Sequence, residues 1–131
     1  MPKPGDSRAA LVFVYGTLMR GYALHLLLAH ASKFLGEGRV HGRLVDLGRY
    51  PGLVDGAGSV RGEIYRLDDR ELLAVLDRAE GYNFGRRRTT VTLASGRRAR
   101  AWVYRYRGRR KKAVLIPDGD YRRAHPRPAI L

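Results

Sequence analysis

The strongest constraint on the fold is a short, unbroken apolar run near the N-terminus. Residues 11–15 have the sequence Leu-Val-Phe-Val-Tyr, and Gly16 closes the run. A strand with one face in water alternates apolar and polar residues, whereas a continuous apolar run of this length is typical of a strand buried on both faces. The sequence therefore predicts an internal strand that ends in the turn Tyr15-Gly16-Thr17-Leu18.

Further β-rich segments follow, and turn-forming residues separate them. They lie near residues 38–47, 60–67, 87–94 and 98–107, with Gly48, Pro51-Gly52, Gly56, Gly58 and Ser95-Gly96 between them. A first helix is predicted over residues 22–31, where four apolar residues recur at helical spacing: Leu24, Leu27, Leu28 and Ala31. The chain thus combines strands with helices.

A second helix is predicted over residues 69–80. Asp68 or Asp69 can cap its first turn, and Gly81 is placed to end it in a left-handed conformation. Its apolar stripe contains Leu72, Leu73, Val75, Leu76 and Ala79. At about 100° per residue, Glu80 falls inside that stripe, so its carboxylate is predicted to point inward.

An inward-facing carboxylate such as Glu80 is costly to bury unless it is hydrogen-bonded or paired. Partial burial raises its pKa toward the range useful to a general base. The residues alone leave two interpretations open. Glu80 is either a functional acid/base, or a helix-end residue that reaches solvent past Gly81 or pairs with one of Arg86 to Arg88.

The turn Tyr15-Gly16-Thr17-Leu18 is the second candidate site. Backbone N–H groups in a glycine-containing turn after a buried strand converge on a concavity that binds carboxylates or developing oxyanions. The alternative is a plain connection from strand to helix, in which Thr17 makes a local hydrogen bond.

The length of 131 residues suits one domain. We expect that domain to span residues 11–122, with a flexible segment over 1–10 and a tail over 123–131. The chain has no cysteine, which excludes disulfides and thiolate chemistry. Its N-terminal residues are too polar for a signal peptide or a membrane span, so a cytoplasmic protein without membrane contact is expected.

The net charge of +14 is unevenly distributed. Residues 1–85 hold 11 Lys and Arg against 10 Asp and Glu, whereas residues 86–123 hold 14 against 2. We interpret the basic block as a solvated face, and a nucleic-acid site is the alternative. Aromatic residues alternate within it, which favours core packing but also suits stacking on RNA bases: Trp102, Tyr104 and Tyr106.

Motifs for other chemistries are absent from the sequence. It contains no phosphate-binding glycine loop, no serine-hydrolase elbow and no paired-histidine zinc motif. Four scattered histidines show no metal-ligand spacing, and no role is assigned to His25, His30, His41 or His125. Neither a metal nor a cofactor is expected.

Several motifs, taken in order, resemble the gamma-glutamylcyclotransferase-like family over about residues 11–121. Read together they are more specific than any one of them: Tyr15-Gly16-Thr17-Leu18, Leu47-Gly48-Arg49-Tyr50-Pro51-Gly52-Leu53-Val54, Val60-Arg61-Gly62-Glu63-Ile64-Tyr65, Leu76-Asp77-Arg78-Ala79-Glu80-Gly81-Tyr82, Ala101-Trp102-Val103-Tyr104 and Ile116-Pro117-Asp118-Gly119-Asp120-Tyr121. The short gamma-glutamylamine cyclotransferases and bacterial stand-alone proteins are the most similar branch.

The resemblance implies an α+β fold, namely a small mixed β-barrel with two principal helices. It also implies release of 5-oxoproline from a gamma-glutamyl amine or peptide, with Glu80 as the general acid/base. Residues expected to bind this small-molecule substrate are Tyr15, Gly16, Thr17, Leu18, Pro51, Gly52, Arg86 and Tyr121. A monomer or weak homodimer is expected.

Two positions depart from the family pattern. Arg86 stands where many members carry a pocket tyrosine, and Tyr121 stands where a tryptophan is common. Two alternatives to the enzyme stay open at this stage. One is a catalytically silent module that binds a small molecule or RNA through residues 86–112. The other is cyclotransferase chemistry on a dedicated biosynthetic partner.

Overall fold

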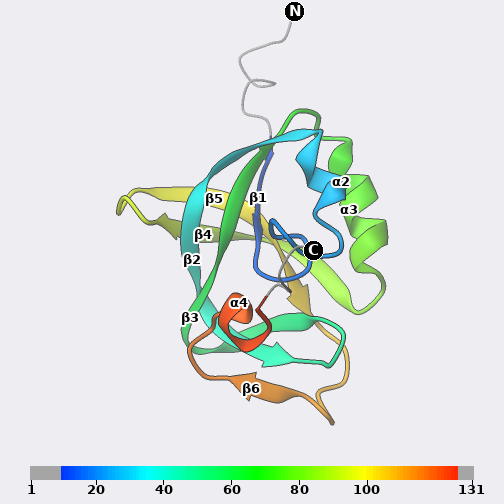
Figure 1. Cartoon of the computed structure of the whole chain (residues 1–131), viewed down its shortest axis with the longest axis vertical. Coiled ribbons are helices and arrows are strands. Elements are labelled where there is room, and N and C mark those ends of the chain that lie inside the picture. Colours follow the sequence, from blue (N-terminus) through cyan, green and yellow to red (C-terminus); the bar gives the residue numbers. More distant parts are fainter. Residues whose placement is uncertain (1–9, 127–131) are drawn as a thin grey trace, which may run out of the picture.

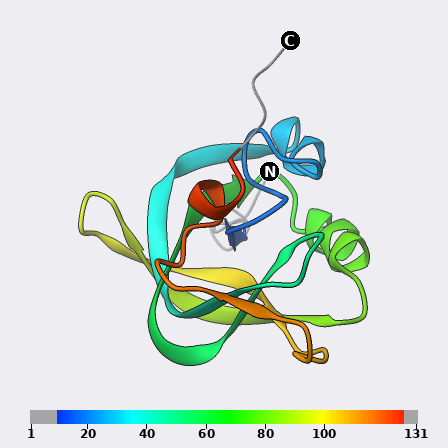
Figure 2. The same cartoon turned by 60° about the horizontal axis from the view of Figure 1, so that its bottom comes forward.

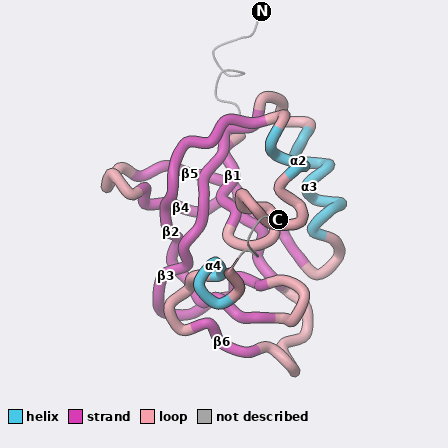
Figure 3. The backbone as a smooth tube through the Cα atoms, in the orientation of Figure 1, coloured by secondary structure: helices cyan, strands magenta, loops and turns pink. Residues whose placement is uncertain are grey.

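The computed structural model describes residues 10–126. Its strands form a closed five-stranded barrel in the ring order β1-β3-β2-β4-β5, and a short sixth strand pairs with the far end of β2. The strands are β1 (Leu11–Val14), β2 (Ser32–Asp46), β3 (Pro51–Leu67), β4 (Phe84–Leu93), β5 (Arg98–Tyr106) and β6 (Val114–Ile116). The helices are α2 (Leu26–Ala29), α3 (Leu72–Glu80) and α4 (Tyr121–Ala124). Figures 1 and 3 show α2 and α3 together on one side of the barrel. The predicted α+β barrel is confirmed.

Strand β1 is the internal strand that the apolar run predicts. Val12, Phe13 and Val14 are at most 2% exposed, although successive side chains point to opposite faces. In Figure 2, β1 lies within the ring drawn by the longer strands. It runs antiparallel to β3 and parallel to β5, so its C-terminal end is held on both sides.

Strands β2 and β3 form one long hairpin that bends instead of ending at its glycines. The sequence predicts that Gly56 and Gly58 separate strands, but both lie within β3. Their φ angles are +148° and +125°, and the partner strand changes register between His41 and Arg43, around Gly42. Such positive φ angles are open to glycine, so these residues curve the hairpin around the barrel.

Helix α2 is shorter than the helix predicted over residues 22–31. The chain before it winds through successive turns, in which Tyr22 N–H donates to the carbonyl of Met19 and His25 N–H to that of Tyr22. Gly21 has a φ of +90°, which interrupts helical geometry, and Leu24 N–H donates back to the carbonyl of Thr17. This hydrogen bond, which reaches back seven residues along the chain, replaces the first helical turn.

Helix α3 begins later than predicted but ends where the sequence places its end. The Asp69 carboxylate accepts a hydrogen bond from Glu71 N–H at 2.8 Å, before the first helical residue. Gly81 follows the last residue with a φ of +86°. Leu73 and Leu76 are buried against the barrel. The orientation of α3 is therefore fixed up to Glu80.

The C-terminal part crosses the boundary expected at residue 122, because α4 extends to Ala124. The Tyr22 hydroxyl donates to the carbonyl of His125, and the His125 ring nitrogen lies 2.5 Å from an Asp46 carboxylate oxygen. Residues 1–9 and 127–131 of the expected terminal segments lie outside the described residues. Within residues 10–126, no helix is long and apolar enough to cross a membrane.

One carboxylate is buried inside the fold. Glu63 is 2% exposed and accepts hydrogen bonds from Arg20 N–H, the Arg20 Nε, the Tyr65 hydroxyl and Arg122, at 2.8–3.1 Å. Burial disfavours its charged form, but these donors outweigh that effect and hold the pKa of Glu63 below its usual range. Glu63 thus connects the end of the first turn region to α4.

We expect Glu63→Gln to lower the free energy of unfolding at pH 7 by about 2 kcal/mol, because the buried amide offers one acceptor oxygen instead of two and the partly exposed guanidinium groups of Arg20 and Arg122 lose their counterion. Since the pKa is lowered, this stabilisation is present above the ordinary carboxyl pKa and is lost as the pH falls through the lowered value. Urea unfolding at pH 7 and pH 3 measures both effects. Glu37→Gln is the matched control, because that side chain is 73% exposed. Equal stability of the two variants at pH 7 would contradict the expectation.

Candidate active site

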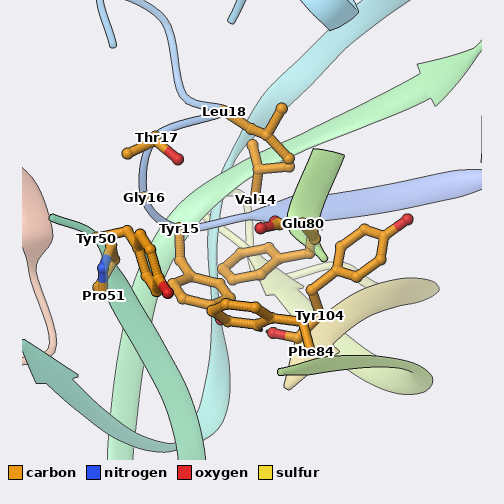
Figure 4. Close-up of a pocket in the computed structure, with 11 residues that line it drawn as sticks. Val14, Tyr15, Gly16, Thr17, Leu18, Tyr50, Pro51, Glu80, Phe84 and Tyr104 are labelled. Atoms are coloured by element: carbon orange, nitrogen blue, oxygen red, sulfur yellow. Dashed lines mark hydrogen bonds between the residues drawn. The ribbon is translucent and has the colours of Figure 1, made fainter. Parts of the chain in front are cut away.

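A small pocket lies where β1 ends. The turn after β1 forms one wall, and α3, the start of β3, β4 and β5 supply the others. Its lining residues are Phe13, Val14, Tyr15, Gly16, Thr17, Leu18, Tyr50, Pro51, Glu80, Phe84 and Tyr104. Figure 4 shows the Glu80 carboxylate directed toward the side of the pocket on which the turn lies. The two candidate features of the sequence therefore share one concavity.

The turn is held from outside the pocket by its carbonyl groups. Met19 N–H donates to the Gly16 carbonyl at 3.0 Å, Leu24 N–H donates to that of Thr17 at 2.8 Å, and a His25 ring nitrogen lies 2.9 Å from that of Leu18. Within residues 10–126, no acceptor takes the N–H groups of Gly16, Thr17 or Leu18. The turn therefore presents unused donors for an anionic ligand.

Gly16 is required by its neighbour. A Cβ at this position would lie 2.5 Å from Cγ and 2.8 Å from Cδ of Pro51. A proline ring cannot swing away as a flexible side chain can, so only glycine lets the turn and the start of β3 approach this closely. Pro51 thus fixes the position of the turn amides.

Tyr15 lines the pocket, whereas its hydroxyl is buried and hydrogen-bonded to the backbone of neighbouring strands. The hydroxyl donates to the Tyr104 carbonyl at 2.5 Å and accepts a hydrogen bond from Leu53 N–H at 3.0 Å. Burial, followed by the negative charge of Glu80, raises the pKa of Tyr15 above its usual value. The hydroxyl therefore stays protonated and is not a proton shuttle.

Glu80 is a partly buried carboxylate without a partner. No hydrogen bond or ion pair to it occurs within the described part of the chain. Burial raises the pKa of Glu80 to about 7, because the charged form is poorly solvated there. Arg86 does not pair with Glu80, because its guanidinium binds Asp77 instead. Its Nε donates to Asp77 Oδ1 at 2.9 Å and its NH2 donates to Asp77 Oδ2 at 3.2 Å.

Three residues expected to bind substrate lie away from this pocket. Arg86 lines a neighbouring groove and stacks on Trp102, with 4.5 Å from Cζ to the ring centroid. Gly52 lies against Tyr106, which a Cβ would approach to 2.6 Å. Tyr121 is buried against Tyr22, with ring centroids 5.5 Å apart. These positions suit packing and the groove rather than contact with a ligand beside Glu80.

Sequence reasoning missed the aromatic walls formed by Tyr50, Phe84 and Tyr104. Tyr104 could have been found by its alternation with Trp102 and Tyr106, which places it on the side of β5 that α3 covers. Its hydroxyl donates to Asp77 at 2.7 Å. Tyr50 carries no such periodic signal, because it lies between two strands.

The pocket is narrow. Its free volume is about 20 Å³, which is room for roughly one water molecule. A larger ligand requires that a wall move, and Tyr50, which is 37% exposed, is the wall residue least enclosed by the core. Within residues 10–126, no group of three His, Asp or Glu side chains could hold a metal ion.

The sequence of the chain is similar to those of known proteins. The family model described as gamma-glutamyl cyclotransferase, AIG2-like, matches residues 12–123. A Vibrio cholerae relative, named provisionally as a gamma-glutamylcyclotransferase, is 43% identical over 113 residues, which cover 85% of this chain and 94% of its own. The Escherichia coli gamma-glutamylcyclotransferase family protein YtfP is 34% identical over 84% of this chain and 94% of its own.

Solved structures show the same fold. Protein PH0828 from Pyrococcus horikoshii superposes with a TM-score of 0.71 at 27% identity, over 88% of this chain and 92% of its own. An AIG2-like protein from Mus musculus superposes with a TM-score of 0.63 at 29% identity, over 73% of this chain and 76% of its own. The comparisons do not favour the RNA-binding alternative.

The raised pKa of Glu80 has a consequence for stability. Between about pH 4.5 and pH 7 the folded protein keeps a proton that the unfolded chain has released, so stability falls as the pH rises through this window. We expect Glu80→Gln to remove this loss of stability. At pH 8.5 its free energy of unfolding should be higher than that of the wild type by on the order of 2 kcal/mol.

The measurement is urea unfolding of both proteins at pH 4.5 and pH 8.5. The control is Glu71→Gln, at the exposed beginning of the same helix, for which no comparable gain at high pH is expected. A Glu80→Gln protein whose advantage does not grow with pH would show that the carboxylate is well solvated.

Proposed function

The chain belongs to the gamma-glutamyl cyclotransferase, AIG2-like family, and from this premise we propose that it releases 5-oxoproline from gamma-glutamyl amines or peptides. One observation carries the proposal. A partly buried, unpartnered carboxylate, Glu80, lines the same pocket as a turn whose N–H groups are unused. That combination supplies both a proton carrier and an anion site.

The reaction suits a pocket without a nucleophilic side chain. The substrate's α-amine attacks its own γ-carbonyl carbon, a C–N bond forms that closes a five-membered lactam, and the original amide C–N bond breaks. The α-nitrogen loses protons and the departing nitrogen gains one, so the products are 5-oxoproline and a free amine. The protein has to fold the substrate for attack and to move protons.

Glu80 is suited to the proton transfers. With a pKa of about 7 it exists in both protonation states near neutral pH. It would accept a proton from the α-ammonium group before the attack and return a proton to the departing nitrogen. A positioned acid/base group of this kind contributes about 10²- to 10⁴-fold in rate.

The turn would hold the charged end of the glutamyl group. Its N–H groups at Gly16, Thr17 and Leu18 can bind the α-carboxylate or the oxygen on which charge develops. Losing one oxyanion donor costs about 3 kcal/mol of transition-state stabilisation in well-studied cases. Because the free volume beside the turn is only about 20 Å³, substrate entry would displace the exposed Tyr50 ring.

We expect Glu80→Gln to lower kcat for 5-oxoproline formation by about 10²- to 10⁴-fold with little change in KM. The assay measures 5-oxoproline released from gamma-glutamyl-alanine, gamma-glutamyl-ε-lysine and glutathione. Glu71→Gln, at the exposed residue just before α3, should keep wild-type activity. No 5-oxoproline from any of the three substrates, or equal turnover by Glu80→Gln, would overturn the proposed function.

A second expectation concerns the turn. Gly16→Ala should reduce kcat/KM by at least about tenfold, because its Cβ would overlap the Pro51 ring and displace the amides. The double variant Gly16→Ala/Pro51→Ala removes the overlapping ring atoms and should recover part of that loss. A double variant no better than Gly16→Ala alone would mean that the turn is not positioned by this contact.

A further inference from the structure

A second concavity adjoins the Glu80 pocket. It is a shallow groove of about 720 Å³, formed by the end of α3, the beginning of β4 and the end of β5. Its lining residues are Asp77, Arg78, Gly81, Tyr82, Phe84, Gly85, Arg86, Trp102, Tyr104 and Arg107. Phe84 and Tyr104 line both concavities, so the two are neighbours that share these side chains as a wall.

Glu80 stands at the junction of the two. It faces the pocket, whereas Asp77, one helical turn earlier, and Gly81, the next residue, face the groove. In the proposed reaction the glutamyl part occupies the pocket, and the departing nitrogen has to lie within reach of Glu80. The rest of the leaving amine then extends past Phe84 and Tyr104 into the groove.

The charge of the groove is positive. Three arginines line it, Arg78, Arg86 and Arg107, against one acid. That acid, Asp77, is already neutralised, because its two oxygens accept hydrogen bonds from Arg86. Within residues 10–126, neither Arg78 nor Arg107 makes an ion pair. The groove therefore offers uncompensated cationic donors.

Arg107 is placed for such a contact. Its Nε donates to the Tyr82 carbonyl at 3.1 Å, which fixes the side chain against another residue that lines the groove. The NH1 of Arg107 lies close to Gly85, because a Cβ added to Gly85 would be 3.3 Å from it. The terminal nitrogens are left for an anion. Arg86 is likewise fixed, by Asp77 and by the Trp102 ring.

We propose that this groove binds the leaving amine of the substrate and selects amines that carry a carboxylate, namely amino acids and peptides, over simple amines and polyamines. This inference rests on the proposed function. Two guanidinium groups without counterions attract an additional carboxylate and repel a cationic polyamine, and the net charge of +14 adds to both effects.

The test is a series of gamma-glutamyl compounds whose leaving amines differ in charge: putrescine, ethylamine, glycine and glutamate. At low salt, kcat/KM should rise along the series, by about tenfold or more from ethylamine to glutamate, and the rise should shrink at 0.5 M salt. Arg107→Gln should reduce the glutamate-to-ethylamine ratio by about three- to fivefold, and Arg107→Glu should reduce it further. Arg97→Gln, at the other end of the β4–β5 hairpin, removes the same charge and should keep the ratio.

A binding measurement separates this inference from the proposed function. Trp102 is the only tryptophan of the chain and lines the groove, so its fluorescence reports on occupancy there. Gamma-glutamyl-glutamate should quench or shift this fluorescence in Glu80→Gln, with a Kd about tenfold lower than that of gamma-glutamyl-ethylamide.

The outcomes are distinct. If wild type releases no 5-oxoproline from any compound but the anionic ligand binds more tightly at Trp102, the proposed function fails and the charge selectivity of the groove stands. If 5-oxoproline is released at rates that do not depend on the charge of the leaving amine, and Kd is equal across the series, the groove inference is overturned. Equal effects of Arg107→Gln and Arg97→Gln would also overturn it.

Discussion

The Tyr15 hydroxyl is the contact on which the arrangement of the site depends. It lies where β1 ends and joins the carbonyl of Tyr104 on β5 to the N–H of Leu53 on β3. A buried hydroxyl that both donates and accepts satisfies two backbone groups at once, in a place where water is excluded. The three strands are therefore held at a fixed separation at this point. The turn amides, Pro51 and the ring of Tyr104 take their positions from it.

The buried and partly buried carboxylates of the fold differ in whether hydrogen-bond donors surround them. Glu63 and Asp77 are surrounded by donors: two arginines and a tyrosine around Glu63, one arginine and a tyrosine around Asp77. Glu80 is partly buried without any such compensation, and its pKa rises to about 7 whereas that of Glu63 falls. A partly buried carboxylate without a partner reduces stability at neutral pH, and Glu80 has none although Arg86 binds Asp77, one helical turn earlier. Such an uncompensated cost is typical of a functional group rather than a structural one.

Local patterns were sufficient for the features set by periodicity. The apolar run identified β1, helical phase placed Glu80 on the inner side of α3, and Gly81 marked the end of that helix. Patterns failed where a hydrogen bond outside the helical repeat, a glycine conformation or a distant partner decides the outcome. Leu24 N–H bonds to Thr17 and shortens α2, and Gly56 and Gly58 bend β3 rather than ending it. The burial of Glu63 could not be predicted from local patterns either, because its donors come from Arg20 and Arg122, far away in the sequence.

Arg86 shows how a departure from a family pattern can act at a distance. The resemblance placed it at the wall of the Glu80 pocket, but its guanidinium reaches outward to Asp77 and lies over Trp102. Asp77 in turn accepts the hydroxyl hydrogen bond of Tyr104, whose ring is the wall. Arg86 therefore affects the Glu80 pocket through two hydrogen-bonded neighbours, Asp77 and Tyr104, while it lines the groove directly. Because its charge is already matched by Asp77, Arg86 orders the boundary between the two concavities, and in our proposal the selection of an anion falls to Arg78 and Arg107.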